Sequence, residues 1–506
     1  MKINLREYQK EGVDEIRFSY MKGNDNVLFV LPTGGGKTVI FSHIAEQAAQ
    51  KGNRVCILVH REELVNQSSE ALDKIGVKHG IISAGQKMDL SYGVQIASVW
   101  TLVRRLHKVP DTFFGLIVVD EAHHAVAGSW KKTIDHFYTA KVLGVTATPE
   151  RLDGKGLKDY FSDMIVGPDT AWLTANKYLA PAKVYSPPLK VDRKNIKTRA
   201  GDFAMEEAEE QLMNGDFMGD AVTHYARHVF PGSAIAFCCT VAHAEAVAEA
   251  FRTAGFKAEA LAGKIAKEER KETIQKLGTR EINVLTSCQI ISEGTDVPSV
   301  AGALLLRPTK SLSLYLQQVG RCLRPAEGKD HAVVMDHVGN SLVHGLPTQA
   351  REWSLEGRKK REKDAAPPLK VCKSCYAVAP ISAKICPTCG EPFEVEKKEF
   401  IRIDGDLVER FFVVGQTVEY LLRDGRWGKD WRIMGQDNET KTYWINNGQF
   451  DQFKVDAVRL RPPLKTAMKN AKSFDDLKKL AKQRGYKEGW AYYVWKQRQM
   501  KNAKWV

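Results

Sequence analysis

The chain has 506 residues, 43% of them hydrophobic and 27% charged, and its 75 basic and 61 acidic side chains give a formal net charge of +14. This length predicts several domains of about 150 residues each, and the composition excludes disordered and fibrous proteins. No apolar run approaches the roughly 20 residues of a membrane span, and residues 1–8 lack the apolar stretch of a signal peptide, so we expect a cytoplasmic protein with no membrane partner.

Two sets of short apolar runs predict two α/β domains in tandem. The first set covers residues 27–31, 54–59, 94–97, 116–119 and 142–145, and the second covers 234–238, 258–261, 283–286, 301–306 and 332–335. Helical patterns fall between the runs of each set, which is typical of a doubly wound parallel sheet. Between the sets, residues 178–219 are polar and charged and indicate a break.

The first apolar run leads into a glycine-rich turn, Gly34, Gly35 and Gly36, which Lys37 and Thr38 follow at the start of a helical pattern. A strand, such a turn and a helix cradle a triphosphate, because backbone N–H groups can close around the phosphates. The lysine then reaches the β- and γ-phosphate oxygens, and the hydroxyl of Thr38 binds Mg²⁺. The strict pattern has glycine where this chain has Leu31, so the turn alone does not decide the function.

A pair of acidic residues, Asp120 and Glu121, follows the apolar run 116–119. Asp120 can hold Mg²⁺, and Glu121 can orient or deprotonate the attacking water, which is the division of roles that phosphoryl transfer requires. A solvent-exposed acidic pair is the alternative, but acids at the end of a buried strand rarely face bulk solvent by accident. With the glycine-rich turn, the pair predicts an ATPase that uses ATP and Mg²⁺.

Two arginines of the second α/β set, Arg321 and Arg324, lie about one helical turn apart in the segment that begins at Gln317. If the two domains form a cleft, these guanidinium groups can neutralise the transition-state charge of ATP bound to the first domain. A solvated basic helix is the alternative.

Four of the nine cysteines form two CxxC pairs, Cys372 with Cys375 and Cys386 with Cys389. Each pair can present two thiolates to one tetrahedral Zn²⁺, and because no open ligand position is implied, we expect a structural site. Two disulfides are the alternative, which a cytoplasmic composition disfavours. The other cysteines are expected to be small buried hydrophobic residues.

The excess positive charge belongs to the C-terminal part of the chain. Residues 1–350 hold 42 basic and 40 acidic side chains, whereas residues 451–506 hold 15 basic and 5 acidic ones. Six of the ten tryptophans lie between Trp427 and Trp505, interleaved with lysine and arginine. Aromatic and basic side chains together indicate nucleic-acid contact. The alternatives are that Trp427, Trp431 and Trp444 form the core of a small β-barrel, and that residues 465–504 present a solvated helix face.

Three of these features resemble, in their order along the chain, motifs of the superfamily 2 helicases and translocases: the glycine-rich turn, the acidic pair and the segment that begins at Gln317. The resemblance covers about residues 1–340. The resemblance implies two RecA-like domains, with Gln317 near the γ-phosphate and Arg324 as the better arginine finger. It also implies that Gln9 contacts adenine, and that Gly294 and Asp296 contact the nucleotide. Contacts with nucleic acid, or coupling of those contacts to hydrolysis, fall by resemblance to His60, Arg61, Ser98, His123, Thr146 and Thr148. The chain departs from the family at Trp100, where relatives often carry glutamine, and residues 237–242 fit motif IV only loosely.

The eight residues 31–38, the segment 336–340 after the last apolar run, and the four-cysteine element further resemble bacterial and phage DNA-repair helicases of the RadD type. We therefore expect an ATP-dependent DNA helicase or translocase of the bacterial cytosol, host or phage encoded, that acts on single-stranded or branched DNA in replication, recombination or repair. A single-strand-binding or other repair protein is a candidate partner. The alternatives are an RNA helicase and the motor of a nuclease or restriction complex.

The expected organisation has seven parts. They are a first RecA-like domain (1–180), a connector (181–218), a second RecA-like domain (219–350), a charged linker helix (351–370), a zinc ribbon (371–395), a small β-barrel-like module (400–463) and a basic helical tail (464–506).

Overall fold

The computed structural model describes residues 4–124, 128–150, 156–188, 193, 196–199, 202–213, 215–261, 265–288, 297–357, 368–393, 412, 414–422, 426–437, 442–448, 453–456, 460–461, 463–471, 473–487 and 489–502. The chain forms two compact units, Met1–Val395 and Glu396–Val506, which are described separately.

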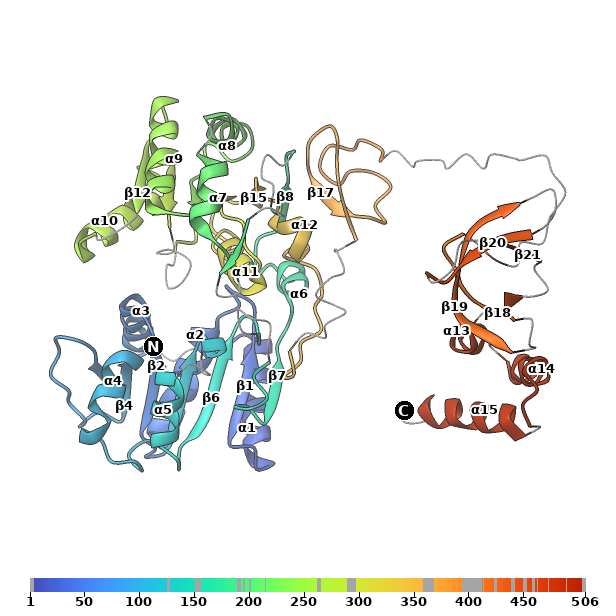
Figure 1. The fold of residues 1–506 in the computed structure, drawn as a ribbon. Coiled ribbons are helices and arrows are strands. Elements are labelled where there is room, and N and C mark those ends of the chain that lie inside the picture. The colour runs from blue at the N-terminus through green and yellow to red at the C-terminus, as the bar shows by residue number, and fades with distance from the viewer. Residues whose placement is uncertain are drawn as a thin grey trace. The chain divides into compact units, whose positions relative to one another are not determined.

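The first unit begins with a seven-stranded parallel sheet in the order β3-β4-β2-β5-β6-β1-β7 (Figure 1). Its strands are β1 (Asn26–Val30), β2 (Val55–Val59), β3 (His79–Ile82), β4 (Val94–Ser98), β5 (Leu116–Asp120), β6 (Lys141–Thr146) and β7 (Asp163–Val166). Its helices are α1 (Glu7–Met21), α2 (Lys37–Gln50), α3 (Glu62–Lys74), α4 (Val99–Arg105), α5 (Gly128–His136) and α6 (Thr170–Ala175), with short 3-10 turns η1 (Leu106–Lys108) and η2 (Ala122–His124). The five predicted strands are confirmed, and the prediction missed the edge strands β3 and β7, which are only partly buried.

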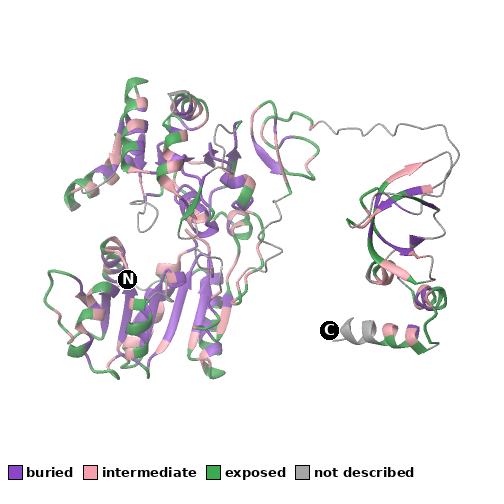
Figure 2. Cartoon of the chain, viewed as in Figure 1, coloured by how far each residue is buried: buried purple, intermediate pink, exposed green. Residues whose placement is uncertain are grey.

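Helices cover both faces of this sheet because successive strand residues point to opposite sides. Val27 and Phe29 of β1 pack into one hydrophobic cluster together with residues of α1, α2 and α3. Leu28 and Val30 pack into a second cluster with residues of α4 and α5. Burial on both faces explains why the central strands read as continuous apolar runs, and these strands are coloured as buried in Figure 2.

A second parallel sheet of six strands follows, in the order β12-β13-β11-β14-β15-β8. Its strands are β8 (Ala182–Tyr185), β11 (Ala234–Phe237), β12 (Ala258–Leu261), β13 (Val284–Ser287), β14 (Gly302–Leu305) and β15 (Ala332–Asp336). The helices are α7 (Met205–Leu212), α8 (Gly215–His228), α9 (Val241–Thr253), α10 (Lys267–Gly278), α11 (Leu312–Gly320) and α12 (Asn340–His344), and a short hairpin joins β9 (Thr198–Arg199) to β10 (Asp202–Phe203). The edge strand β8 comes from the stretch that we expected to be a connector.

The segment after α12 crosses back to the first sheet's domain. Leu355 O accepts hydrogen bonds from the backbone N–H groups of Leu157 (2.8 Å) and Lys158 (3.0 Å), and Trp353 packs against both large hydrophobic clusters. The expected helix over 351–370 is therefore wrong for residues 351–357, which are not helical, and for its last residues, which begin the strand β16 (Leu369–Val371). Residues 358–367 lie outside the described part. The backbone of this segment is held by hydrogen bonds to a neighbouring domain instead of by helical ones.

The cysteine-rich element contains the two-stranded sheet of β16 (Leu369–Val371) and β17 (Val378–Pro380). It docks on the second α/β domain, because Tyr185 forms a β-bridge with Ala377 and the N–H of Ser186 donates to Tyr376 O at 2.8 Å. The other five cysteines include four buried ones, as expected, and the half-buried Cys288.

The second unit holds a five-stranded antiparallel sheet in the order β21-β20-β19-β18-β22, so that the last strand pairs with the first. The strands are β18 (Thr417–Leu421), β19 (Trp427–Asp437), β20 (Thr442–Asn446), β21 (Phe453–Asp456) and β22 (Leu460–Arg461). Trp431 lies in the core of this sheet at 4% exposure, as in the alternative above, whereas Trp444 is 38% exposed.

Three helices follow the sheet: α13 (Leu464–Asn470), α14 (Phe474–Arg484) and α15 (Gly489–Asn502). Ser473 and Asp476 form a capping box at the start of α14, and Gly485 ends that helix with a φ of +67°. Arg484 donates to Glu419 of β18 at 2.8 Å, and both side chains are less than a tenth exposed. This buried ion pair fixes the helices to the sheet. Among the described residues, no helix is long and apolar enough to span a membrane.

Candidate active site

The glycine-rich turn lies between β1 and α2, as the sequence predicts. Gly34 and Gly36 have φ angles of +85° and +90°, which side chains other than glycine rarely adopt. A Cβ atom on Gly36 would lie 2.4 Å from Nε2 of Gln9, so a side chain at this position would displace the Gln9 amide. The turn then delivers the N-terminus of α2, with its free N–H groups, to the adjoining cleft.

The departure from the strict pattern at Leu31 has a structural explanation. The Leu31 side chain is completely buried and packs beneath Gly35 of the turn, where a Cβ atom on that glycine would lie 2.8 Å from Leu31 Cγ. The Leu31 carbonyl oxygen accepts a hydrogen bond from Lys37 Nζ at 3.2 Å. Burial lowers the pKa of Lys37, while Glu121 and Asp120 favour its charged form. Arg321 opposes that charge, as does Arg324. The lysine is thus held among two acids and two arginines.

The acidic pair is buried at the end of β5, with exposures of 7% for Asp120 and 9% for Glu121. The N–H of Glu121 donates to its neighbour's carboxylate, Asp120 Oδ1, at 3.0 Å. Glu121 has a φ of +50°, an uncommon conformation for a residue with a side chain. Residues held in such conformations cluster at functional sites, and the burial excludes the solvent-exposed acidic pair.

A chain of polar contacts connects this pair to the end of β6. Nδ1 of His123 lies 3.4 Å from Glu121 Oε2 and 3.2 Å from Thr146 Oγ1. The Thr146 hydroxyl in turn donates to the carbonyl of Thr148 at 2.8 Å. The predicted coupling residues His123, Thr146 and Thr148 are therefore in one contiguous network with Glu121.

The second α/β domain contributes α11 and the turn that follows it. Nε2 of Gln317 lies 3.5 Å from Glu121 Oε2, at the limit of a hydrogen bond. A Cβ atom on Gly320 would lie 2.6 Å from Cβ of Thr33, so α11 approaches the glycine-rich turn closely. Arg321 is 7% exposed, and burial lowers the pKa of Arg324 to about 10.

These elements border one cleft of about 780 Å³. Its lining includes the predicted residues Gln9, Gly34, Gly36, Lys37, Thr38, Asp120, Glu121, Arg321 and Arg324. Gly35 belongs to the same turn, and its carbonyl accepts a hydrogen bond from the Tyr8 hydroxyl at 2.8 Å. A pocket of this size is within the usual range for nucleotide-sized ligands.

The lining also includes residues that the sequence did not single out, among them Arg6 and Tyr178. The guanidinium carbon of Arg6 lies 4.5 Å from the centroid of the Tyr178 ring, and both residues border the cleft beside Gln9. Arg6 lies three positions before Gln9, so the same short stretch of sequence could have indicated it. Tyr178 lies 169 positions after Gln9, so no local pattern connects the two residues.

The remaining predicted nucleic-acid residues lie away from the cleft lining. Ser98 ends β4 beside Val59 of the parallel strand β2, and His60 and Arg61 directly follow that strand. These three residues are thus grouped at the carboxyl ends of two adjacent strands. Gly294 and Asp296 lie outside the described residues.

The four-cysteine cluster has the geometry of a zinc site. The Sγ atoms of Cys372, Cys375, Cys386 and Cys389 all lie within 4.8 Å of one another. Two of the separations are 3.7 Å (Cys372 to Cys389) and 3.6 Å (Cys375 to Cys386). Tetrahedral thiolates at the usual Zn–S distance lie about 3.8 Å apart, so the cluster could bind one Zn²⁺.

Comparison with known proteins identifies the family. Residues 2–151 match the family described as the type III restriction enzyme, res subunit, and residues 220–326 match the helicase conserved C-terminal domain. Together these matches span more than half of the chain, one on each parallel sheet. The chain belongs to the superfamily 2 helicases. As a superfamily 2 helicase it is a nucleic-acid-dependent ATPase, whereas the resemblance to the RadD type stays a prediction.

Individual relatives of this superfamily 2 helicase come from a phage and a yeast. A 51.5 kDa protein of a Lactococcus phage (isolate 7-9) is 35% identical over 74% of this chain and 80% of that protein. The putative ATP-dependent helicase IRC3 of Saccharomyces cerevisiae is 34% identical over 67% of this chain, which spans about half (52%) of the yeast protein. A fragment of a putative HsdR subunit of a type I restriction enzyme from Vibrio vulnificus YJ016 has a TM-score of 0.54 at 22% identity and covers 68% of this chain and 66% of its own. That likeness concerns the fold alone.

Proposed function

We propose that the protein is an ATP- and Mg²⁺-dependent DNA translocase or helicase that acts on single-stranded or branched DNA intermediates. The observation that carries the proposal is the cleft, which is lined by Lys37, Asp120 and Glu121 of the first α/β domain together with Arg321 and Arg324 of the second. A site shared by two domains can couple ATP binding to domain closure, and hydrolysis to opening.

In this proposal each side chain of the cleft has a separate role. The turn that contains Gly34, Gly35 and Gly36 cradles the phosphates, and Lys37 neutralises the β- and γ-phosphate oxygens. Thr38 and Asp120 hold Mg²⁺, while Glu121 orients the attacking water and Gln317 senses the γ-phosphate region. Arg324 acts as the arginine finger (a cation that stabilises charge on the transferring phosphate), with Arg321 beside it.

Adenine recognition falls to Gln9. Its amide is held in place by the backbone, since Oε1 accepts a hydrogen bond from the N–H of Arg6 at 3.0 Å. This leaves Nε2 directed at the glycine-rich turn, where it lies next to Gly36. The zinc ion, in turn, stabilises the cysteine-rich element and takes no part in hydrolysis, because four thiolates leave no open ligand position.

DNA strands would pass the carboxyl ends of β2 and β4, where His60, Arg61 and Ser98 are grouped. The His123, Thr146 and Thr148 network then connects Glu121 to that side of the sheet. A second handle on DNA lies in the other unit, where Lys478, Lys479 and Lys482 of α14 are exposed. Phosphate neutralisation by such lysines supports binding without sequence preference.

One experiment separates this proposal from its two rivals. ATP hydrolysis is measured with matched single-stranded DNA, single-stranded RNA, forked DNA and unbranched duplex DNA. The proposal predicts the strongest stimulation by single-stranded or forked DNA. Equal or stronger stimulation by RNA would instead support an RNA helicase.

The restriction-motor alternative is favoured by a specific observation, since one matching family is described as the res subunit of a type III restriction enzyme. In this alternative we expect the motor to move along intact duplex. Stimulation by unbranched duplex that equals or exceeds stimulation by forked DNA would therefore favour it.

A further inference from the structure

The turn after α11 contains a lysine with no part in the proposed nucleotide contacts. The chain passes from Arg321 through Arg324 to a tight turn at Gly328, which has a φ of +72°. The N–H of Lys329 closes this turn by donating to Ala326 O at 3.1 Å. The Lys329 side chain then extends back beneath the turn and is only partly exposed.

The Lys329 ammonium binds backbone carbonyl groups of two separate segments. It donates to Cys322 O (2.5 Å) and Arg324 O (2.8 Å) in the turn after α11. It also donates to Val300 O (2.5 Å) and Pro298 O (3.3 Å) in the segment that precedes β14. An ammonium group has three protons, so four carbonyls use its full capacity and share at least one proton.

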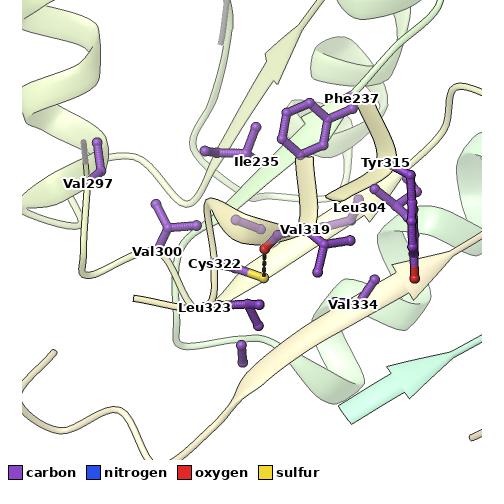
Figure 3. Close-up of a cluster of buried hydrophobic side chains, with 14 of the residues drawn as sticks. Ile235, Phe237, Val297, Val300, Leu304, Tyr315, Val319, Cys322, Leu323 and Val334 are labelled. Carbon is purple, nitrogen blue, oxygen red and sulfur yellow. Dashed lines mark hydrogen bonds between the residues drawn. The ribbon is translucent and has the colours of Figure 1, made fainter. Parts of the chain in front are cut away.

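Both segments reach the nucleotide cleft. Pro298 and Arg324, whose carbonyl groups the ammonium contacts, both line that cleft. Val300 and Cys322 are buried in a hydrophobic cluster, part of which Figure 3 shows, with Val297, Val319 and Leu323 nearby. The cluster fixes one side of each segment, and Lys329 fixes their backbones to each other.

We propose that Lys329 is a positioning residue for the arginine finger: by tying the carbonyls of Cys322 and Arg324 to those of Pro298 and Val300, it holds the Arg324 side chain at the nucleotide. This inference rests on the proposed function of Arg324. A finger contributes only when its guanidinium meets the charge that develops on the phosphate, and displacement by about 1 Å can cost on the order of 100-fold in rate. Lys329 acts on that geometry without contact to the nucleotide.

The protonation of Lys329 provides a signature of this role. Burial lowers the pKa of Lys329 to about 8, and the positive charge of Arg324 acts in the same direction. A Cys322 thiolate would favour the charged lysine. Burial raises the pKa of that thiol to about 11, so the thiol is neutral near pH 8. The Pro298–Val300 segment has no titratable side chain, and Glu327 and Asp330 on the lysine's own turn are exposed. Above about pH 8 the neutral amine has lost one of its three donors, which weakens the tie.

The test compares Lys329→Met with wild type in the full chain, using DNA-stimulated ATP hydrolysis. We expect kcat to fall about 10- to 100-fold, with KM for ATP changed less than about twofold. The wild-type kcat should decline above about pH 8, whereas the low kcat of the variant should not share that decline. The matched control is Lys141→Met, since Lys141 is also partly exposed and near a carbonyl, Tyr20 O at 3.5 Å, but lies away from the cleft.

Two results would overturn the inference. One is a kcat for Lys329→Met within about twofold of the Lys141→Met control, and the other is a decline above pH 8 that persists in Lys329→Met. If Lys329→Met does not fold, the wild-type profile decides: a constant kcat between pH 7 and pH 9.5 contradicts the role, and a decline in kcat with unchanged binding of a non-hydrolysable ATP analogue supports it. Failure of the proposed function appears separately, as normal hydrolysis by Lys37→Ala.

Discussion

At the scale of single residues, the proposed hydrolysis of ATP depends on Glu121. Its carboxylate lies within 3.5 Å of groups from two domains, His123 of the first and Gln317 of the second. A water molecule activated by Glu121 would therefore lie near side chains of both domains. Replacing the Glu121 carboxylate by an amide would remove its ability to accept a proton and change the shape of the site little.

Glu121→Gln should therefore abolish turnover and keep ATP binding. The amide has nearly the same size but cannot accept a proton, so we expect hydrolysis to fall about 100-fold or more, since general-base catalysis contributes about 10²–10⁴-fold. Single-turnover hydrolysis and binding of a fluorescent ATP analogue measure the two effects. Glu249→Gln, at an exposed position of α9, is the control. Loss of nucleotide binding in Glu121→Gln would contradict the assigned role.

Single residues also show what the sequence could and could not predict. Gln9, Lys37, Asp120 and Arg324 stand in local motifs, so their meeting at one cleft followed from motif order. Tyr178 lies in no motif and reaches the cleft only through the fold. Lys329 is also invisible in sequence, because its partners are backbone carbonyls, which every residue type has.

At the scale of elements, the turn between β1 and α2 sets the geometry of the site. Its backbone must enter the left-handed region at Gly36 and must also pass close to the Gln9 amide. Gly36 must therefore satisfy both a conformational and a steric requirement. Another glycine of the chain, Gly52, has the left-handed conformation without the close contact. Gly52, which follows α2, has a φ of +83° with no atom within 4 Å of its Cβ position.

Gly36→Ala and Gly52→Ala form a matched pair. Both should lose about 1–2 kcal/mol of stability from the left-handed backbone. Only Gly36→Ala should also lose ATP affinity, by about 10-fold or more, because a methyl group displaces Gln9 and the turn that surrounds the phosphates. Thermal unfolding and titration with an ATP analogue measure the two properties. Equal ATP affinity in the two variants would show that the turn tolerates a side chain and would count against the phosphate site.

Elements differ in how well periodicity predicts them. The central strands were predicted because they are buried on both faces. The tail 464–506 was predicted as helical, and Gly485 ends α14 while Gly489 begins α15. The edge strand β7 was missed since only one of its four residues is buried. The segment 351–357 was predicted as helix from its charge, but its backbone hydrogen bonds go to Leu157 and Lys158, which no local pattern reveals.

At the scale of the whole molecule, most of the excess positive charge lies outside the part of the chain that contains the proposed ATP site. Residues 1–350, which contain both parallel sheets, have nearly balanced charge, with 42 basic and 40 acidic side chains. The second unit and the segment before it hold the surplus. The net charge of +14 therefore describes an appended basic section more than the motor itself.

Neutralising exposed lysines of the second unit should reduce the salt dependence of DNA binding. We choose Lys479, Lys482, Lys487 and Lys496, which are all exposed, and replace them together by glutamine. Each lost phosphate contact lowers the slope of log K against log salt by about 0.7 on single strands, so a reduction of up to about 3 is expected. The control replaces four exposed lysines of the first unit, Lys10, Lys22, Lys51 and Lys257. Equal slopes for the two variants would refute the basic section as a handle on DNA.

The central claim is that the turn before α2 binds and hydrolyses ATP when the protein engages DNA. The most direct measurement is DNA-stimulated ATP hydrolysis by Lys37→Ala beside the wild type, with DNA binding measured on the same samples. The account predicts that hydrolysis is abolished while DNA binding is retained, because the ammonium that neutralises the phosphates is lost and the DNA-contacting groups are untouched. Hydrolysis at the wild-type rate by Lys37→Ala would contradict it.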